Sequence, residues 1–300
     1  MKSFVGITGT TCVGKSAVAV ELAKILNCDV ISADSMQIYN GMDVGTAKVT
    51  LDEMAGVKHH MLDVVEPCCD FSSFEYAEMV AKIIDSMQNP PIIVGGTGFY
   101  FDSLLYPPEF SGGDKQRRAE LKQMLDQNGL DYMVKYLTEL DQDTASQIDL
   151  KNPVRVIRAI EIAETGQKQS QGTTRKNPQY DAKIFVLQRD RQSLYKMIDQ
   201  RVDKMVQNGL VDEVKALVDK YGYCQNSAFS AIGYKEIIQY LQGACTLDVA
   251  IEQIKLNTRH YAKRQISYFK RMQITRYIDV EGKTPFEIAS EIANCIKNSF

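Results

Sequence analysis

The sequence predicts an α/β fold in which a parallel sheet is flanked by helices and a helical domain is inserted. Two observations carry this prediction. The first third of the chain alternates short β-prone runs with amphipathic helical patterns, and a strand-poor helical stretch then separates it from a later strand. Strands that alternate with helices favour a parallel sheet with helices on both faces. We therefore expect a core of residues 1–110 and 181–300, with a helical insertion at residues 111–180.

The first elements follow from hydrophobic periodicity. Residues 3–8 form a short β-prone run, and residues 16–26 carry apolar side chains at helical spacing. Strands are next expected at residues 28–32 and 91–94, with a helix at residues 74–87 between them. Because parallel strands need a crossover connection, usually a helix, this order is typical of β–α–β units.

The later elements divide between the insertion and the second part of the core. Three helices are expected in the insertion, at residues 115–127, 132–139 and 153–164. The polar, turn-rich residues 169–180 predict a loop at its end. The core then resumes with one strand and two helices, at residues 183–187, 194–207 and 210–221.

The composition is that of a globular protein, with 44% hydrophobic and 24% charged residues. The 35 basic and 38 acidic residues give a net charge of −3, so any nucleic-acid surface must be a local patch. No apolar run reaches the ~18 residues that span a bilayer, and the apolar residues 4–7 are too few for a secretory signal. The seven cysteines contain no C-x-x-C pair, so neither a zinc site nor a disulfide framework is expected, and the reducing cytoplasm is the expected compartment.

The strongest motif is GTTCVGKS, a complete G-x-x-x-x-G-K-[ST] pattern placed between a predicted strand and a predicted helix. Its residues are the candidate diphosphate-binding group: Gly9, Thr10, Thr11, Cys12, Val13, Gly14, Lys15 and Ser16. The glycines permit a tight loop whose amides face phosphate oxygens, the lysine supplies a cation, and the Ser16 hydroxyl can bind Mg²⁺. This motif predicts a P-loop NTPase-like core that binds a di- or triphosphate.

A carboxylate near this motif is harder to interpret from the residues alone. Asp34 follows the strand predicted at residues 28–32 and could support a metal ion, as in a kinase or ATPase. A lone Asp after a strand is also a common turn former or helix cap. The other strong strand ends in Gly95-Gly96-Thr97-Gly98, which contains no acidic residue. The acidic groups expected of a kinase are therefore sparse.

Further blocks, spread over nearly the whole chain, resemble the tRNA dimethylallyltransferase (tRNA isopentenyltransferase) family in its compact bacterial form. The matching blocks include residues 34–39 (DSMQIY), 41–48 (GMDVGTAK), 95–100 (GGTGFY), 153–162 (PVRVIRAIEI) and 261–265 (YAKRQ). The sequence departs from the family pattern at Thr10, often Pro, at Cys12, often Ala, and at Asn152, where Asp is common. None of these departures removes a group to which the family assigns a catalytic role.

The resemblance implies transfer of a dimethylallyl group from dimethylallyl diphosphate to N6 of adenosine-37, beside the anticodon of tRNA, with release of diphosphate and with Mg²⁺ as the cofactor. By this resemblance Asp34 is the general base, Thr97 a hydroxyl at the site, and Arg201 a ligand of the diphosphate. The implied partner is the tRNA anticodon stem-loop, without a membrane, and the enzyme is expected to act as a monomer. The implied tRNA-binding residues are Asp34, Ser35, Met36, Gln37, Thr97, Arg118, Val154, Arg155, Val156, Ile157 and Arg158.

Two basic features fit an RNA partner. Arg155 and Arg158 are three residues apart on a predicted helix and so share a face. Residues 255–278 contain seven Lys or Arg and no Asp or Glu, an uneven distribution in a chain with a net charge of −3. Three other readings stay open: an adenylate isopentenyltransferase acting on free AMP, ADP or ATP, a P-loop small-molecule kinase, and a non-catalytic RNA-binding NTPase.

Overall fold

The structure is a computed structural model, and it describes residues 2–107, 115–166, 178–224, 226, 228–272 and 276–297. The chain divides into two compact units. Unit 1 comprises Met1–Leu105 and Tyr180–Phe300, and unit 2 comprises Tyr106–Gln179. Most of the loop expected at residues 169–180 lies outside the described residues.

Unit 1 contains a parallel sheet. Within the described residues it has six strands in the order β3-β2-β4-β1-β5-β6, and every neighbouring pair is parallel. The strands are β1 (Ser3–Gly9), β2 (Val30–Ser32), β3 (His59–His60), β4 (Ile92–Val94), β5 (Asp181–Gln188) and β6 (Arg276–Asp279). The predicted α/β class with a parallel sheet is confirmed. The sequence pattern missed β3 and β6, the two short edge strands.

Helices of unit 1 follow the strands. They are α1 (Lys15–Leu26), α2 (Leu51–Met54), α3 (Ser73–Ser86), α4 (Gly98–Leu105), α8 (Arg191–Gln207), α9 (Leu210–Tyr221), α10 (Tyr234–Leu241), α11 (Leu247–Phe269) and α12 (Pro285–Lys297). No helix among the described residues is both long and apolar enough to cross a bilayer.

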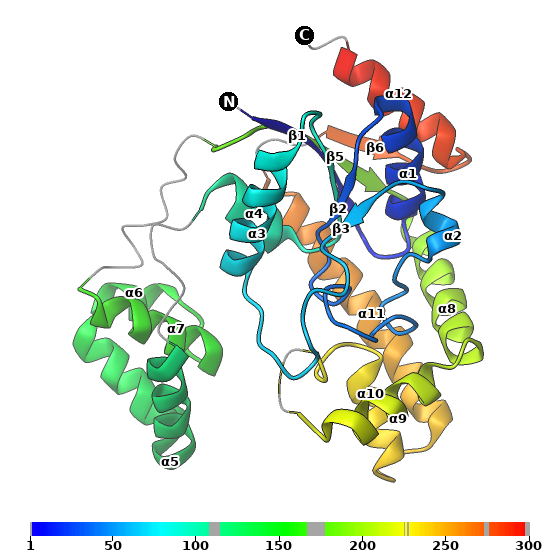
Figure 1. The fold of residues 1–300 in the computed structure, drawn as a ribbon. Helices are drawn as coiled ribbons and strands as arrows, with labels where there is room; N and C mark the ends of the chain where they lie inside the picture. The colour runs from blue at the N-terminus through cyan, green and yellow to red at the C-terminus, as the bar shows by residue number, and fades with distance from the viewer. Residues whose placement is uncertain are drawn as a thin grey trace. The chain divides into compact units, whose positions relative to one another are not determined.

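The alternation of side chains along β1 explains how the sheet is covered. Val5 and Ile7 point to one face, where they pack in a core with residues of α1 and α12. Gly6 points to the other face, where a Cβ atom would meet the side chain of Phe101 on α4 at 3.1 Å. Figure 1 shows α1 and α12 together on one side of the sheet and α3 and α4 on the other. Both faces are therefore closed, as near-continuous apolar strands require.

A second cluster of unit 1 lies beyond the sheet. Buried residues of α8, α9, α10 and α11 pack there against the segment that follows β2, through Ile38, Tyr39 and Met42. The prediction that the chain has no disulfide is wrong at one pair, because Cys68 and Cys224 are bonded. The two cysteines are 156 residues apart in the sequence, so no local spacing could indicate this disulfide.

Unit 2 is helical in its described part. Its helices are α5 (Lys115–Leu140), α6 (Gln142–Gln147) and α7 (Pro153–Glu164). The sequence predicted two helices where α5 stands, and Gly129, with φ 80° and ψ 172°, interrupts the helical geometry between them. Unit 2 has a core of its own, built from Leu121, Met133, Leu137 and Ile160 together with their neighbours.

Candidate active site

The GTTCVGKS motif forms the turn between β1 and α1. Gly9 ends the strand, and a Cβ atom there would lie 2.3 Å from the carbonyl oxygen of Leu187 on β5, so only glycine permits this approach. Gly14 precedes the helix in the left-handed region, at φ 93°. A glycine-framed loop that leads into a helix N-terminus is the arrangement that binds phosphate oxygens.

Lys15 is the cation of this loop. It is half-buried, and its Nζ donates a hydrogen bond to the carbonyl oxygen of Thr10 at 2.7 Å. Burial lowers the pKa of Lys15 from its ordinary value of 10.5 to about 8, against the opposing charge of Asp34 and with a further lowering by Arg201. A bound diphosphate would place negative charge beside Lys15 and so favour its charged form.

The remaining residues of the loop divide between a cavity and the core. Thr11, Cys12 and Ser16 line the cavity described below. Val13 is 2% exposed and packs in the core with β1 and α1. The hydroxyl of Thr10 is buried and finds no hydrogen-bond partner in the part of the chain that the structure describes. Any contact of Thr10 or Val13 with a diphosphate would therefore run through their backbone.

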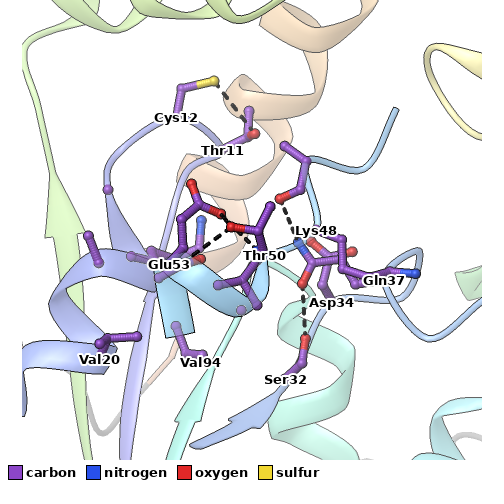
Figure 2. A pocket seen from close by; sticks show the side chains of 18 of the residues that line it. Thr11, Cys12, Val20, Ser32, Asp34, Gln37, Lys48, Thr50, Glu53 and Val94 are labelled. Atoms are coloured by element: carbon purple, nitrogen blue, oxygen red, sulfur yellow. Dashed lines mark hydrogen bonds between the residues drawn. The ribbon is translucent and has the colours of Figure 1, made fainter. Parts of the chain in front are cut away.

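A cavity of about 810 Å³ lies beside the loop and gathers the main candidate residues. Lys15, Ser16, Asp34, Gln37 and Arg201 all line it, although they come from three distant stretches of the sequence. Figure 2 shows Asp34 and Gln37 near one another, and the hydroxyl of Ser32, the last residue of β2, donates to the side-chain Oε1 of Gln37 at 3.4 Å. The cavity thus places cations and a carboxylate around one space.

Asp34 and Thr97 approach one another because their strands are neighbours. Asp34 follows β2 and Thr97 follows β4, and parallel strands end at the same edge of a sheet. The Asp34 Oδ1 accepts a hydrogen bond from the amide of Met36 at 2.9 Å. The amide of Ser35 donates to Thr97 Oγ1 at 3.1 Å, which ties the two loops together. Gly95 permits this, since a Cβ atom there would lie 2.0 Å from the backbone oxygen of the residue before Asp34.

Arg201 reaches the cavity from α8. Its NH2 group donates to the carbonyl oxygen of Thr46 at 3.2 Å, and its NH1 group lies 3.9 Å from the Sγ atom of Cys12. The guanidinium therefore stands between the P-loop and the loop at residues 43–48. This is a position from which a planar fork of donors can bind phosphate oxygens.

Two further residues of the site come from α11, and the sequence did not single them out as site residues. Tyr261 lines the cavity, and its pKa is raised to about 12 by burial and by the charge of Asp34, so the phenol keeps its proton. Gln265 accepts from the amide of Thr11 at 2.8 Å and donates to the carbonyl oxygen of Gly96 at 3.0 Å. Their spacing of four residues places both on one helix face, which is a signal that could have found them.

The candidate tRNA-binding residues of unit 2 differ in exposure. Val154 is 74% exposed and Arg155 is exposed, whereas Val156 and Ile157 are 0% and 6% exposed and pack in the core of the unit. Any contact of Val156 or Ile157 with RNA would therefore run through the backbone, and their role in tRNA binding stays a prediction. Asn152 caps the helix, because its Oδ1 accepts from the amides of the second and third residues of α7.

Arg118 and Arg158 share one buried carboxylate in unit 2. Both oxygens of Glu161 accept from Arg118, at 2.7 and 2.8 Å, and one of them also accepts from Arg158 at 3.1 Å. The two guanidinium groups lower the pKa of Glu161 despite its burial. The carboxylate therefore stays ionised and fixes the direction of both arginines.

Only part of the basic stretch at residues 255–278 is available to bind phosphate groups of RNA. Lys255 and Arg259, on α11, form ion pairs with carboxylates of α8 at 2.8 Å. Among the described residues of this stretch, Arg276 on β6 is exposed without a carboxylate partner, as are Lys263, Arg264, Lys270 and Arg271. The helix ends at Phe269, so the last two of these lie in the turn that follows it.

A P-loop that shares a cavity with a carboxylate at the same edge of a parallel sheet defines a class of phosphate-binding α/β enzymes. Comparison with known proteins narrows this class. Residues 37–272 match the family described as IPP transferase, and residues 3–69 match the family described as isopentenyl transferase. The chain therefore belongs to the IPP transferase family, which contains the tRNA dimethylallyltransferases.

Similar proteins agree with this assignment. The tRNA dimethylallyltransferase of Clostridioides difficile strain 630 is 42% identical, over 98% of this chain and 97% of its own. That of Bacillus subtilis strain 168 is 42% identical over 96% and 95%. Among solved structures, the tRNA isopentenylpyrophosphate transferase of Bacillus halodurans has a TM-score of 0.75 at 36% identity and covers 99% of this chain and 96% of its own. A eukaryotic dimethylallyltransferase acting on tRNA has a TM-score of 0.85 at 26% identity, over 99% and 80%.

Proposed function

We propose that this chain transfers the dimethylallyl group of dimethylallyl diphosphate to N6 of adenosine-37 in tRNA and releases diphosphate. One observation carries the proposal together with the family membership: Lys15, Ser16 and Arg201 share one cavity with the carboxylate of Asp34. Cations suit a departing diphosphate, and a carboxylate suits an amine that must lose a proton.

The proposed reaction breaks one bond and forms another. The allylic C–O bond of the donor breaks, and the electron pair leaves with the diphosphate, whose charge Lys15 and Arg201 balance. The N6 nitrogen of the adenine forms the new bond to carbon, and its proton passes to Asp34. The hydrogen bond from the Met36 amide to Asp34 Oδ1 orients this carboxylate and leaves its second oxygen available to the amine.

Ser16 is the residue that would hold Mg²⁺. Its side chain stands at the start of α1 on the cavity wall, and a hydroxyl with diphosphate oxygens forms the hard oxygen donor set that Mg²⁺ prefers. When bound, the ion would neutralise charge that develops on the departing diphosphate.

The tRNA partner would be recognised by both units. An adenine stacked in an anticodon loop must leave the stack to enter a cavity. Gln37 lines the cavity with Asp34, and Ser35 and Met36 stand between them in the chain, with their amides bonded to Thr97 and Asp34. In unit 2, Arg118 and Arg158 are oriented by a shared carboxylate and Arg155 is exposed, which supports phosphate contacts by these arginines. Such an enzyme would work in the cytoplasm, where tRNA is found.

Nucleoside mass analysis tests the proposal. The protein is incubated with dimethylallyl diphosphate and unmodified tRNA, and the digested nucleosides are examined for adenosine that carries a dimethylallyl group. Parallel reactions replace tRNA by AMP, or supply labelled ATP in place of the donor. We expect the modified nucleoside from tRNA alone. Modification of AMP with untouched tRNA would establish the adenylate isopentenyltransferase, and phosphate transfer from ATP would establish a kinase.

A further inference from the structure

The carboxylate of Glu213 accepts four hydrogen bonds from groups that are not part of its own helix turn. The residue lies in the first turn of α9 and is half-buried. Its Oε2 accepts from the amides of Asp43 and Val44, at 2.9 and 2.7 Å. Its Oε1 accepts from the amide of Gly45 at 3.0 Å and from the hydroxyl of Tyr234 at 2.6 Å. Three consecutive backbone amides therefore converge on one negative charge, as in a backbone anion nest.

Thr46, the residue that follows these amides, bonds two side chains that line the cavity. The carbonyl oxygen of Thr46 accepts from Arg201 NH2 at 3.2 Å and from Gln37 Nε2 at 3.4 Å. Arg201 and Gln37 both line the cavity, whereas Glu213 and Tyr234 are absent from its lining. Glu213 thus holds the amide of Gly45, and the next residue, Thr46, supplies the carbonyl that orients the Arg201 guanidinium and the Gln37 side-chain amide.

The loop at residues 43–48 is held at both ends, so it has little freedom to move when the contact with Glu213 changes. A Cβ atom on Gly45 would lie 2.6 Å from the ring of Tyr234, so the loop rests directly on that ring. Tyr234 is 1% exposed. At the other end of the loop, Lys48 Nζ donates to the carbonyl oxygen of Tyr39 at 2.9 Å and pairs with Asp43 at 2.6 Å. A displacement of the amides would therefore move the Thr46 carbonyl.

We infer that Glu213 is a positioning residue for the transfer reaction: by holding the amides of residues 43–45 it fixes the Thr46 carbonyl and, through it, Arg201 and Gln37. This inference rests on the proposed function for the meaning of the two positioned groups. Its physical core, the coupling between Glu213 and Arg201, concerns diphosphate binding and is measurable without the transfer reaction.

Glu213→Gln tests the inference, because the amide keeps the size of the side chain but turns an NH₂ group toward backbone N–H donors. We expect inorganic pyrophosphate to bind about tenfold more weakly, and kcat/KM for dimethylallyl transfer to fall about 10- to 100-fold, since misplaced groups lose such factors. Glu213→Asp keeps the charge and should recover part of both losses. Asp212→Asn, an exposed carboxyl in the same turn, is the matched control and should behave as wild type.

A double-mutant cycle with Arg201→Ala distinguishes an effect of Glu213 that acts through Arg201 from a general loss of pyrophosphate affinity. In the Arg201→Ala background, Glu213→Gln should change pyrophosphate affinity by less than twofold, because the group that it positions is gone. The same tenfold loss in both backgrounds, or wild-type affinity in Glu213→Gln itself, would overturn the inference. If the wild type shows no transfer, the proposed function fails while the pyrophosphate cycle still decides the coupling.

Tyr234→Phe provides a second test should Glu213→Gln not fold. This variant removes one of the four donors and keeps the ring under Gly45. We expect pyrophosphate binding about two- to fivefold weaker, a smaller loss than in Glu213→Gln, because the three backbone amides still hold the carboxylate. Unchanged binding in a folded Tyr234→Phe protein would overturn the inference in that case.

Discussion

Diphosphate binding should take up a proton at Lys15. Burial lowers the pKa of this lysine from 10.5 to about 8 in the ligand-free protein. At 1.36 kcal/mol for each pH unit, this difference corresponds to about 3 kcal/mol against the charged form. A bound diphosphate would remove that penalty and return the pKa to at least its ordinary value, since an adjacent anion favours the ammonium. The ligand-free site is therefore partly deprotonated at mildly alkaline pH, and the complex is not.

The size of the uptake follows from these two pKa values. Lys15 should bind about 0.1 proton on pyrophosphate binding at pH 7, about 0.5 at pH 8 and about 0.9 at pH 9. Because the complex holds more protons than the free protein, its affinity falls as pH rises through 8, and approaches a tenfold loss for each pH unit toward 10. The same lysine makes the ligand-free fold gain stability between pH 8 and 10.5, where the unfolded chain binds more protons.

Calorimetry in buffers of different ionisation enthalpy measures this uptake. Lys15→Arg is the reference, because arginine keeps its charge throughout this range and the titration of pyrophosphate itself is common to both proteins. The difference in uptake between wild type and Lys15→Arg should rise with pH as stated above. An equal uptake by the two proteins at pH 8 and 9 would refute the reasoning, since Lys15 would then be fully charged before the ligand arrives.

Two other predictions concern contacts that hold the site together. Gln265→Ala should lower the free energy of unfolding by about 2 kcal/mol and weaken pyrophosphate binding, because it leaves the Thr11 amide of the P-loop and the Gly96 carbonyl without the largely buried side chain that bonds both. Denaturant unfolding and calorimetry check this, and Gln253→Ala, exposed on the same helix, should change neither quantity. Of the seven cysteines, five should be alkylated in the unfolded protein without reductant and all seven after reduction, because Cys68 and Cys224 are paired. Their reduction should destabilise the fold by up to about 5 kcal/mol on chain-entropy grounds, and alkylation of all seven without reductant would exclude the disulfide.

Local patterns predicted the fold where elements are long or bounded by special residues. The bounds of α7 and α9 were predicted to the residue, because Pro153 begins one of these helices and Gly209 and Gly222 flank the other. The edge strands β3 and β6 were missed. β3 has only two residues, and in β6 only Ile278 is buried, so neither has an alternation that a sequence pattern can display.

The site was predictable only in part for a related reason. The P-loop and Asp34 are marked by local motifs, and each stands at the end of a strand that periodicity predicts. Gln265 and Glu213 act on segments that lie 254 and about 170 residues away along the chain. No local pattern encodes such contacts, because they arise only when the sheet and the helices of unit 1 have assembled.

The most direct test of the proposed chemistry is a single-turnover measurement with Asp34→Asn. The amide can still accept the hydrogen bond from Met36, so the turn is preserved, but it cannot take a proton from the adenine amine. We predict pyrophosphate binding within a factor of two or three of wild type, and transfer of labelled dimethylallyl to tRNA slowed at least about 100-fold, as expected when a general base is lost. Transfer at the wild-type rate would contradict the role assigned to this carboxylate.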